Sequence, residues 1–373
     1  MKIESCEIVG LFDRENKILC NFNDDINILT GRNGAGKTTI LKLVWYIVSG
    51  NILFALNEIP FQKVTVVTNE YECTVYRLGR NICKIELTID GVKSFYEDGT
   101  DEDDMTYSNA EDHVNPLLIP RGSSVFFPTF RRIEGGFTLD SPRGGASNNR
   151  LVRSRSDVED ALVALSRKLT NEPHVFVSAI STVDIVGILL RQYADLSEIS
   201  NKLQQEMSQG IIETIKDFKS DKADAQQIDS ANNVIDQIRL KIEEMEIDRE
   251  SIMTPIAAVR TLVERLFRHT GIKIGARLSF GDAARAVNSD ALSAGEKQLL
   301  SFICYNAFYK NSIIFIDEPE LSLHVDWQRQ LFSILENQQS SNQFIIATHS
   351  PFIYSKYPDR EINVNPDRGD LGA

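Results

Sequence analysis

The apolar positions of this chain follow two different periods. Nearly continuous apolar runs at 26–29, 313–316 and 344–347 are typical of strands that are buried on both faces. Between about residues 158 and 267, apolar residues instead recur every three or four positions, a spacing that predicts helices. We therefore predict an α/β fold in which two halves of one parallel-sheet core flank a helical insertion.

β-branched and aromatic runs in the first 89 residues or so predict a β-rich lobe, with Asp90-Gly91 as one of its tight turns. The predicted division of the chain is 1–155 for the N-terminal half of the core with this lobe, 156–274 for the helical insertion and 275–373 for the C-terminal half of the core.

Two apolar seams mark the insertion, at 186–207 and 228–245. They predict two helices of about 20 to 25 residues, which would reach ~30 to 38 Å at the rise of an α-helix. A short coiled-coil arm and an ordinary helical subdomain packed on the core both fit this pattern.

A phosphate-binding loop is predicted at Gly31–Thr38 (GRNGAGKT), between the first core strand and a helical pattern. Glycines let backbone N–H groups approach phosphate oxygens, and the helix N-terminus adds partial positive charge. Lys37 would neutralise the outer phosphates, and the Thr38 hydroxyl would hold Mg²⁺. The predicted nucleotide-binding residues of this loop are Asn33, Gly34, Ala35, Gly36, Lys37, Thr38 and Thr39.

Two adjacent carboxylates, Asp317 and Glu318, follow the apolar run 313–316. Ligands of open parallel sheets bind at the carboxyl ends of the strands, and adjacent residues of a strand point to opposite sides. One carboxylate can therefore face a magnesium ion while the other faces the water that attacks a phosphoanhydride. We assign Asp317 to Mg²⁺ and Glu318 to the activation of water.

Composition limits the class of protein. The 373 residues are 42% hydrophobic and 25% charged, as in soluble globular proteins, and contain neither a membrane-spanning run nor a secretory signal. A cytoplasmic location without a membrane partner is expected. Five scattered cysteines predict reduced packing residues. The formal charge of −13 argues against nucleic-acid binding over the whole surface.

A local exception is the segment from Arg121 to Arg155, which holds seven arginines and two acidic residues. Because guanidinium groups bind phosphate oxygens in a bidentate manner, this segment is a candidate nucleic-acid site, in particular Arg131 and Arg132. For 143–155, a solvated loop with scattered ion pairs is the alternative.

Two further segments complete an ordered set of four motifs. Leu292–Gln298 (LSAGEKQ) resembles the signature motif of ABC-type ATPases, and Ala347–Pro351 (ATHSP) resembles their histidine switch. The resemblance implies a P-loop NTPase fold of the ABC type, with Glu318, His349 and Lys37 as catalytic residues. It further implies a head-to-tail homodimer, in which the signature segment of one copy caps the ATP held by the other. The implied nucleotide contacts of that segment come from Ser293, Gly295 and Glu296.

Residues 318–324 (EPELSLH) resemble the RecF, SMC and OLD-nuclease branch of this superfamily, and 127–136 (FPTFRRIEGG) is similar to ATPases of bacterial anti-phage systems such as Septu. The chain departs from that branch in three ways. In the family, a glutamine after the first lobe commonly helps to hold Mg²⁺, and Gln62 is the only candidate for it here. Val325 stands where this branch usually has a proline after Leu-His. The chain also ends at Ala373, before any OLD-type nuclease domain, so a nuclease effector is expected on a separate polypeptide.

The resemblance implies ATP and Mg²⁺ as cofactors, and an ATPase whose nucleotide-dependent dimer gates a nucleic-acid-directed effector in anti-phage defence. A repair or recombination ATPase that clamps DNA is the main alternative. A transporter ATPase subunit and a scaffold that barely hydrolyses ATP are two further alternatives.

Overall fold

The computed structural model describes residues 1–13, 17–100, 106–129, 132–133, 157–180, 182–218, 234–249, 252 and 293–364. The chain divides into two compact units, Met1–Thr182 with Leu292–Ala373, and Val183–Ala291. The second unit begins later than the predicted helical insertion, because α4 (Asp157–Leu169) and β12 (His174–Phe176) belong to the first unit.

A six-stranded parallel sheet with the order β12-β10-β14-β15-β3-β16 forms the core of the first unit. Besides β12, its strands are β10 (Ser124–Phe127), β14 (Ile313–Asp317), β15 (Gln343–Ala347), β3 (Ile26–Thr30) and β16 (Glu361–Asn363). Every residue of β3, β10, β14 and β15 is buried, as expected for parallel strands covered on both faces. The three predicted core strands are therefore confirmed as neighbours.

Helices cover both faces of the parallel sheet. α1 (Lys37–Val48) lies on one face, whereas α8 (Ala294–Phe308) and α9 (Val325–Glu336) lie on the other. Alternate residues of β10 point to the two sides. The ring of Phe126 lies 5.2 Å from that of Trp45 on α1, and the ring of Phe127 lies 4.9 Å from that of Phe302 on α8.

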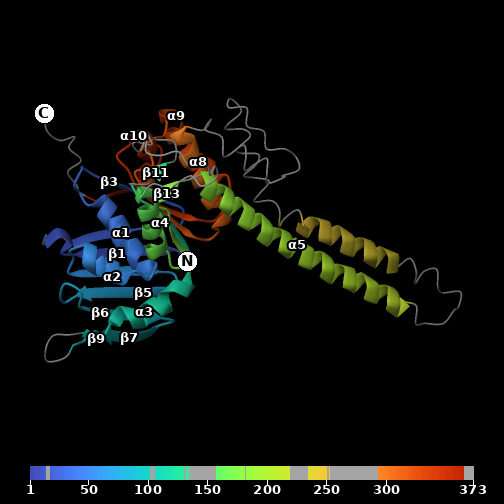
Figure 1. The fold of residues 1–373 in the computed structure, drawn as a ribbon, viewed down its shortest axis with the longest axis horizontal. Coiled ribbons are helices and arrows are strands. Elements are labelled where there is room, and N and C mark those ends of the chain that lie inside the picture. The colour runs from blue at the N-terminus through green and yellow to red at the C-terminus, as the bar shows by residue number, and fades with distance from the viewer. Residues whose placement is uncertain are drawn as a thin grey trace, which may run out of the picture. The chain divides into compact units, whose positions relative to one another are not determined.

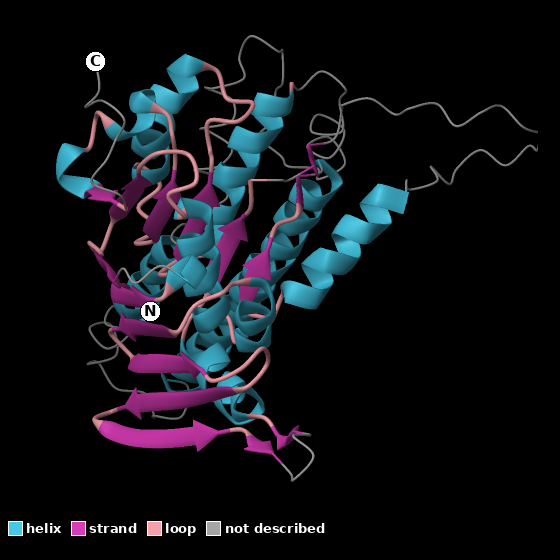
Figure 2. Ribbon diagram, turned by 90° about the vertical axis from the view of Figure 1, so that its left-hand side faces the viewer, coloured by secondary structure: helices cyan, strands magenta, loops and turns pink. Residues whose placement is uncertain are grey.

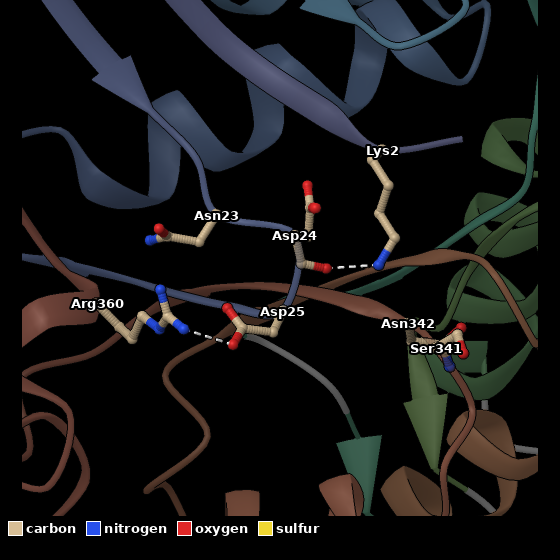
Figure 3. A pocket seen from close by; sticks show the side chains of 7 residues that line it. All are labelled: Lys2, Asn23, Asp24, Asp25, Ser341, Asn342 and Arg360. Atoms are coloured by element: carbon tan, nitrogen blue, oxygen red, sulfur yellow. Dashed lines mark hydrogen bonds and ion pairs between the residues drawn. The ribbon is translucent and has the colours of Figure 1, made fainter.

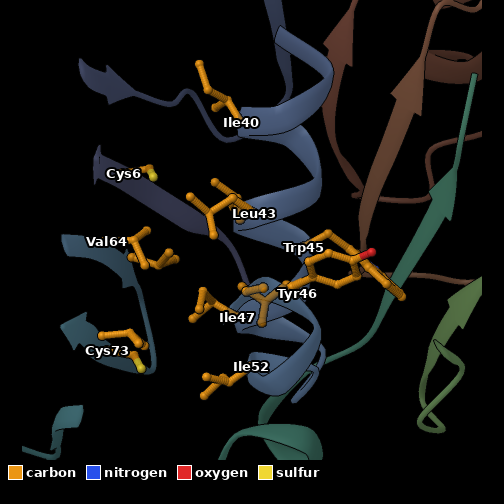
Figure 4. Close-up of a cluster of buried hydrophobic side chains, with 14 of the residues drawn as sticks. Cys6, Ile40, Leu43, Trp45, Tyr46, Ile47, Ile52, Val64 and Cys73 are labelled. Atoms are coloured by element: carbon orange, nitrogen blue, oxygen red, sulfur yellow. The ribbon is translucent and has the colours of Figure 1, made fainter. Parts of the chain in front are cut away.

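A six-stranded antiparallel sheet forms the predicted β-rich lobe (Figure 2). In spatial order its strands are β2 (Lys17–Asn21), β1 (Ile3–Val9), β4 (Lys63–Thr68), β5 (Tyr71–Arg77), β6 (Cys83–Ile89) and β7 (Val92–Glu97). Figure 4 shows Cys6, Val64 and Cys73 of this sheet facing Leu43 and Ile47 of α1. α1 therefore packs between the two sheets, and its N-terminus carries the phosphate loop.

Two details of this lobe match the predictions. Asp90 and Gly91 form the turn from β6 to β7, with φ angles of 50° and 77°. The four cysteines of this lobe (Cys6, Cys20, Cys73 and Cys83) and Cys304 of α8 are buried and form no disulfide, as expected for packing residues.

The other described elements of the first unit are short. They are α2 (Ile52–Glu58), α3 (Ala110–Leu118), α10 (Pro351–Tyr354), the 3-10 turns Leu11–Asp13, Ile119–Arg121 and Pro358–Arg360, and the strand pairs β8 (Gly99–Thr100) with β9 (Thr106–Ser108) and β11 (Arg132–Ile133) with β13 (Ala179–Ile180).

The second unit contains α5 (Thr182–Phe218) and a helix at 234–249, drawn side by side in Figure 1. α5 has 37 residues, or ~55 Å at 1.5 Å per residue, so the predicted helix length of about 20 to 25 residues is wrong for it. The Lys241 amine donates a hydrogen bond to the Thr214 hydroxyl at 3.0 Å, which joins the two helices.

In the helix 234–249, the partly buried residues are not all those of the predicted apolar seam, which includes Ile235 and Ile242. Ile235 and Ile242 are 62% and 40% exposed, whereas Val234, Ile238, Lys241 and Met245 are half-buried. A lysine can occupy a contact row because its aliphatic stem packs while its amine finds a polar partner. Within the ranges that the structure describes, no helix combines the length and apolarity needed to cross a bilayer.

A buried histidine connects the edge of the parallel sheet to α1. Nδ1 of His174 lies 2.8 Å from the Ser124 hydroxyl, and Nε2 lies 3.0 Å from the carbonyl oxygen of Ile119. The Trp45 indole donates to the same hydroxyl at 3.1 Å. A neutral imidazole satisfies all of these groups, and burial lowers the pKa of His174 to about 4.

We expect acid to destabilise the first unit through His174. Its pKa falls from an ordinary 6.5 to about 4 on folding, so the unfolded chain binds the proton first and stability drops as the pH falls from 6.5 toward 4. Between pH 7 and pH 5, this group lowers the free energy of unfolding by about 2 kcal/mol. Urea titrations of the wild type and of His174→Gln would measure the difference; equal acid sensitivity in both would contradict it.

Candidate nucleotide-binding and catalytic site

The phosphate loop connects the end of β3 to the start of α1, as predicted. Gly34 and Gly36 have φ angles of 80° and 94°, in the left-handed region that side chains other than glycine rarely adopt. Apart from the glycine itself and its two chain neighbours, no heavy atom of the described residues lies within 4 Å of the position that a Cβ atom would take at Gly34, so backbone conformation alone requires this glycine. The loop thereby delivers the first N–H groups of α1 to one anion-binding position.

Lys37 lies at the centre of the site. Its side chain is buried, and its amine contacts the carbonyl oxygen of Gly31 at 3.0 Å and Nε2 of His349 at 2.7 Å. Burial lowers the pKa of Lys37, and the charges of Glu318 and Asp317 oppose this effect. The lysine predicted to bind phosphate and the predicted switch histidine are thus in direct contact.

Asp317, the last residue of β14, lies beside two hydroxyl groups. Thr38 donates a hydrogen bond to Oδ1 of Asp317 at 2.9 Å, and the Thr129 hydroxyl donates to Oδ2. Hydroxyl and carboxylate oxygens are the ligands that Mg²⁺ prefers, so the donor set of the predicted pair fits this ion.

Sequence reasoning missed Thr129, which follows β10, the strand next to β14. Gln62, the candidate for a magnesium-holding glutamine, lies in the antiparallel lobe, where its side chain packs beside Gly10. Thr129 was recognisable only as the first polar side chain after Phe127, at the carboxyl end of a strand that the sequence did not place beside 313–316.

Glu318 has a conformation that few non-glycine residues adopt. Its φ angle is 49°, and its backbone N–H donates to the carbonyl oxygen of Ala347 at 2.8 Å. The carboxylate lies 3.3 Å from Nε2 of His349. Burial raises the pKa of Glu318 to about 8, with further contributions from Glu320 and Asp317. Its position beside His349 and next to Asp317 places the Glu318 carboxylate where it can accept a proton from water.

Glu320 organises the histidine switch and was also missed. Its carboxylate accepts hydrogen bonds from the Thr348 hydroxyl at 2.8 Å and from the backbone N–H of His349 at 2.7 Å. Burial and the charge of Lys37 lower the pKa of His349, so its neutral ring can accept a hydrogen bond from the Lys37 amine. Glu320 therefore fixes the backbone that carries His349.

The signature segment starts α8 with a complete capping box. The Ser293 hydroxyl accepts from the backbone N–H of Glu296 at 3.3 Å, and the Glu296 carboxylate accepts from the N–H of Ser293 at 2.6 Å. A Cβ atom at Gly295 would lie 2.2 Å from the carbonyl oxygen of Ser322, so only glycine fits. Leu292 lies outside the described residues. The structure thus brings together Lys37, Thr38, Asp317, Glu318 and His349, whereas the side chains of Ser293 and Glu296 accept hydrogen bonds from each other's backbone N–H groups.

Of the arginine-rich segment, the structure describes two members. Arg121 is half-buried beside Tyr71, and its charge opposes the burial that raises the pKa of that tyrosine. Arg132 lies in β11, opposite Ala179 of β13. Arg131 and the arginines at 143, 150, 153 and 155 lie outside the described residues.

A pocket of about 620 Å³ opens at the opposite, amino-terminal edge of the parallel sheet (Figure 3). Its lining is polar and consists of Lys2, Asn23, Asp24, Asp25, Ser341, Asn342 and Arg360. Arg360 pairs with Asp25 at 2.8 Å, and the Lys2 amine donates to the carbonyl oxygen of Asp24 at 2.5 Å. The cations of this pocket are therefore paired internally, and the pocket is separate from the phosphate loop.

A phosphate loop, an acidic strand end and a histidine after the neighbouring strand, all on one parallel sheet, are the features of a P-loop ATPase of the ABC type. The family model described as "AAA domain, putative AbiEii toxin, Type IV TA system" matches residues 95–355, more than half of the chain. The protein belongs to this family.

The protein is also similar to the "Retron Vc95 probable ATPase" of Vibrio cholerae serotype O1 biovar El Tor, with 28% identity over 139 residues. The match covers 33% of this chain and spans a quarter (25%) of that relative's length.

Two solved structures have a similar course of the chain. One is the Smc head domain with an extended coiled coil, bound to the C-terminal domain of ScpA, from Pyrococcus furiosus, with 14% identity, a TM-score of 0.38 and coverage of 95% of this chain and 91% of that chain. The other is the SMC head domain from Thermotoga maritima, with 13% identity, a TM-score of 0.35 and coverage of 95% and 92%. At these identities and scores, neither bears on function.

Proposed function

We propose that the protein binds ATP with Mg²⁺ and hydrolyses the ATP, and that two copies share each nucleotide. The observation that carries this proposal is the convergence of Lys37, Thr38, Asp317, Glu318 and His349 at the carboxyl edge of one parallel sheet.

Each residue of the site has a separate role in the binding or hydrolysis of ATP. Backbone N–H groups at the start of α1 bind phosphate oxygens, and Lys37 neutralises the outer phosphates. Thr38 and Asp317 would hold Mg²⁺, which when bound neutralises charge on the triphosphate. Glu318 accepts a proton from the attacking water, and the ring of His349, once Lys37 has turned to the phosphates, donates a hydrogen bond to the terminal phosphate.

The signature segment supports sharing of the nucleotide between copies. The capping box fixes Ser293 at the start of α8, and Ser293 is exposed, so that a second copy can reach it. We infer that Ser293, the backbone of Gly295 and the first turn with Glu296 contact the terminal phosphate of an ATP held by Lys37 of a second copy. The dimer would then be tight only while that phosphate is present.

The family description and the retron relative support a role in bacterial defence, in which the nucleotide state gates a separate effector that acts on nucleic acid. Co-expression with neighbouring genes tests this part of the proposal: a protein that co-purifies with the chain supports it. DNA binding by the chain alone that weakens steeply with salt would instead favour a DNA clamp.

Light scattering tests the shared site. We expect a monomer without nucleotide and a dimer with a non-hydrolysable ATP analogue and Mg²⁺. Ser293→Arg should prevent the dimer, because a bulky side chain cannot fit over the phosphates, while leaving ATP binding at Lys37 intact. Ser355→Arg, at an exposed serine after α10, is the control. Dimerisation of the Ser293 variant like that of the wild type would contradict the proposal.

A further inference from the structure

We propose that Gln298 is a positioning residue. When α8 contacts one ATP, Gln298 transmits this contact to the Glu318 carboxylate and so sets its orientation at the other ATP. The inference rests on the proposed function, since it concerns communication between the two shared sites.

Gln298 makes a direct connection between α8 and the backbone next to Glu318. Its side chain is fully buried in the second turn of α8, and its Nε2 donates to the carbonyl oxygen of Pro319 at 2.8 Å. Its Oε1 is also buried, and has no hydrogen-bond partner within the described residues. An amide with one unsatisfied buried acceptor is a poor choice for packing alone, whereas its donor holds one specific carbonyl group.

A second contact joins the first helical turn of α8 to Ser322, at the far end of the backbone turn 318–322 that contains Glu318 and Pro319. The Cα atom of Gly295 lies so close to the carbonyl oxygen of Ser322 that no side chain fits between them. Ser322 has a φ angle of 71°, and Glu318 one of 49°. Two non-glycine residues in left-handed conformations persist only where the surroundings hold them. α8 therefore holds the turn 318–322 at both ends.

The histidine switch holds this turn from another side. Gln328 donates to the carbonyl oxygen of Leu323 at 2.9 Å and accepts a hydrogen bond from the Ser350 hydroxyl at 2.7 Å. Glu320 binds the backbone N–H of His349. Because the turn is fixed to the segment after β15 on this side and to α8 on the other, a displacement of α8 relative to β15 must change the backbone conformation of the turn.

In a head-to-tail dimer, this connection links the two nucleotides. Ser293 and Gly295 of one copy contact the ATP held by the second copy, while Gln298 of the first copy acts on Glu318 at its own ATP. Engagement of one triphosphate then moves the Glu318 carboxylate into place at the other. The consequence is that loss of this connection slows hydrolysis in a dimer that still forms and still binds ATP.

Gln298→Leu tests the inference, because leucine has a similar volume and no donor. We expect kcat to fall by about 10- to 100-fold, the scale for a catalytic group displaced by ~1 Å, while KM for ATP stays unchanged. ATP binding, and ATP-dependent dimerisation in a Glu318→Gln background, should be unchanged. Gln338→Leu is the matched control, because its amide donates to the carbonyl oxygen of Ile303, near the other end of the same helix.

The outcomes separate this inference from the proposed function. A normal kcat in Gln298→Leu would overturn the inference and leave the ATPase intact. A wild type without hydrolysis would overturn the proposed function instead. If Gln298→Leu fails a thermal unfolding test, Gln298→Met, with its flexible unbranched side chain, takes its place under the same criteria.

Discussion

Replacing Glu318 by glutamine is expected to abolish ATP turnover while leaving ATP bound, so that the protein accumulates as a stable dimer. Glutamine has the same shape but cannot accept the proton of the attacking water, and removal of a general base lowers kcat by about 10²- to 10⁴-fold. The contacts of the phosphate loop, Thr38 and Asp317 remain. Because release of the terminal phosphate opens the proposed dimer, a variant that cannot hydrolyse ATP stays closed.

Phosphate release and light scattering with ATP and Mg²⁺ measure the two effects of Glu318→Gln on one sample. Glu336→Gln, at an exposed carboxylate at the end of α9, is the matched control and should behave as the wild type. A Glu318 variant that turns over ATP at the normal rate would show that another group accepts the proton. A variant that is inactive but monomeric with ATP would instead argue against the shared nucleotide.

The parts of this site that lie next to each other along the chain could be predicted from sequence. β3, the phosphate loop and α1 follow one another directly, and so do β14 and Asp317. Their apolar patterns and short motifs contain the information that sets their structure. The resemblance to ABC-type ATPases then supplied the expectation that His349 belongs to the same site.

Residues that act through tertiary contacts could not be predicted in this way. Thr129 reaches Asp317 only because β10 pairs with β14, and the sequence separates these two residues by 188 positions. Glu320 binds the backbone of His349 because its own backbone turns back after Glu318, and no local pattern announces a left-handed glutamate. Both contacts depend on strand order rather than on periodicity.

Two further features illustrate a different limit of prediction from the sequence. β12 has three residues, too few for a periodic signal, and only its pairing with β10 assigns it to the core. In the helix 234–249, the half-buried row includes Lys241, which a pattern of apolar residues excludes. Short edge strands and lysine stems are therefore where hydrophobic patterns stop being informative in this chain.

Replacing Lys37 by alanine is expected to remove nucleotide binding. The lysine amine is the buried cation closest to the predicted phosphate position, and loss of a hydrogen bond to a charged group costs about 2 to 3 kcal/mol, or roughly 30- to 150-fold in Kd. A second effect acts in the same direction. The charge of Lys37 lowers the pKa of Glu318, so its removal leaves the carboxylates of Asp317, Glu318 and Glu320 without this compensation.

Binding of a fluorescent ATP analogue, with and without Mg²⁺, measures the loss for Lys37→Ala. Lys42→Ala is the matched control, since Lys42 lies on the same helix and makes only a solvent-exposed ion pair with Glu58 at 3.5 Å. Unchanged affinity in Lys37→Ala would exclude Gly31–Thr38 as the phosphate loop. If binding is lost while His349→Ala binds at least as tightly as the wild type, ATP displaces the contact between Lys37 and His349, since removal of that contact then leaves the lysine amine available to phosphate.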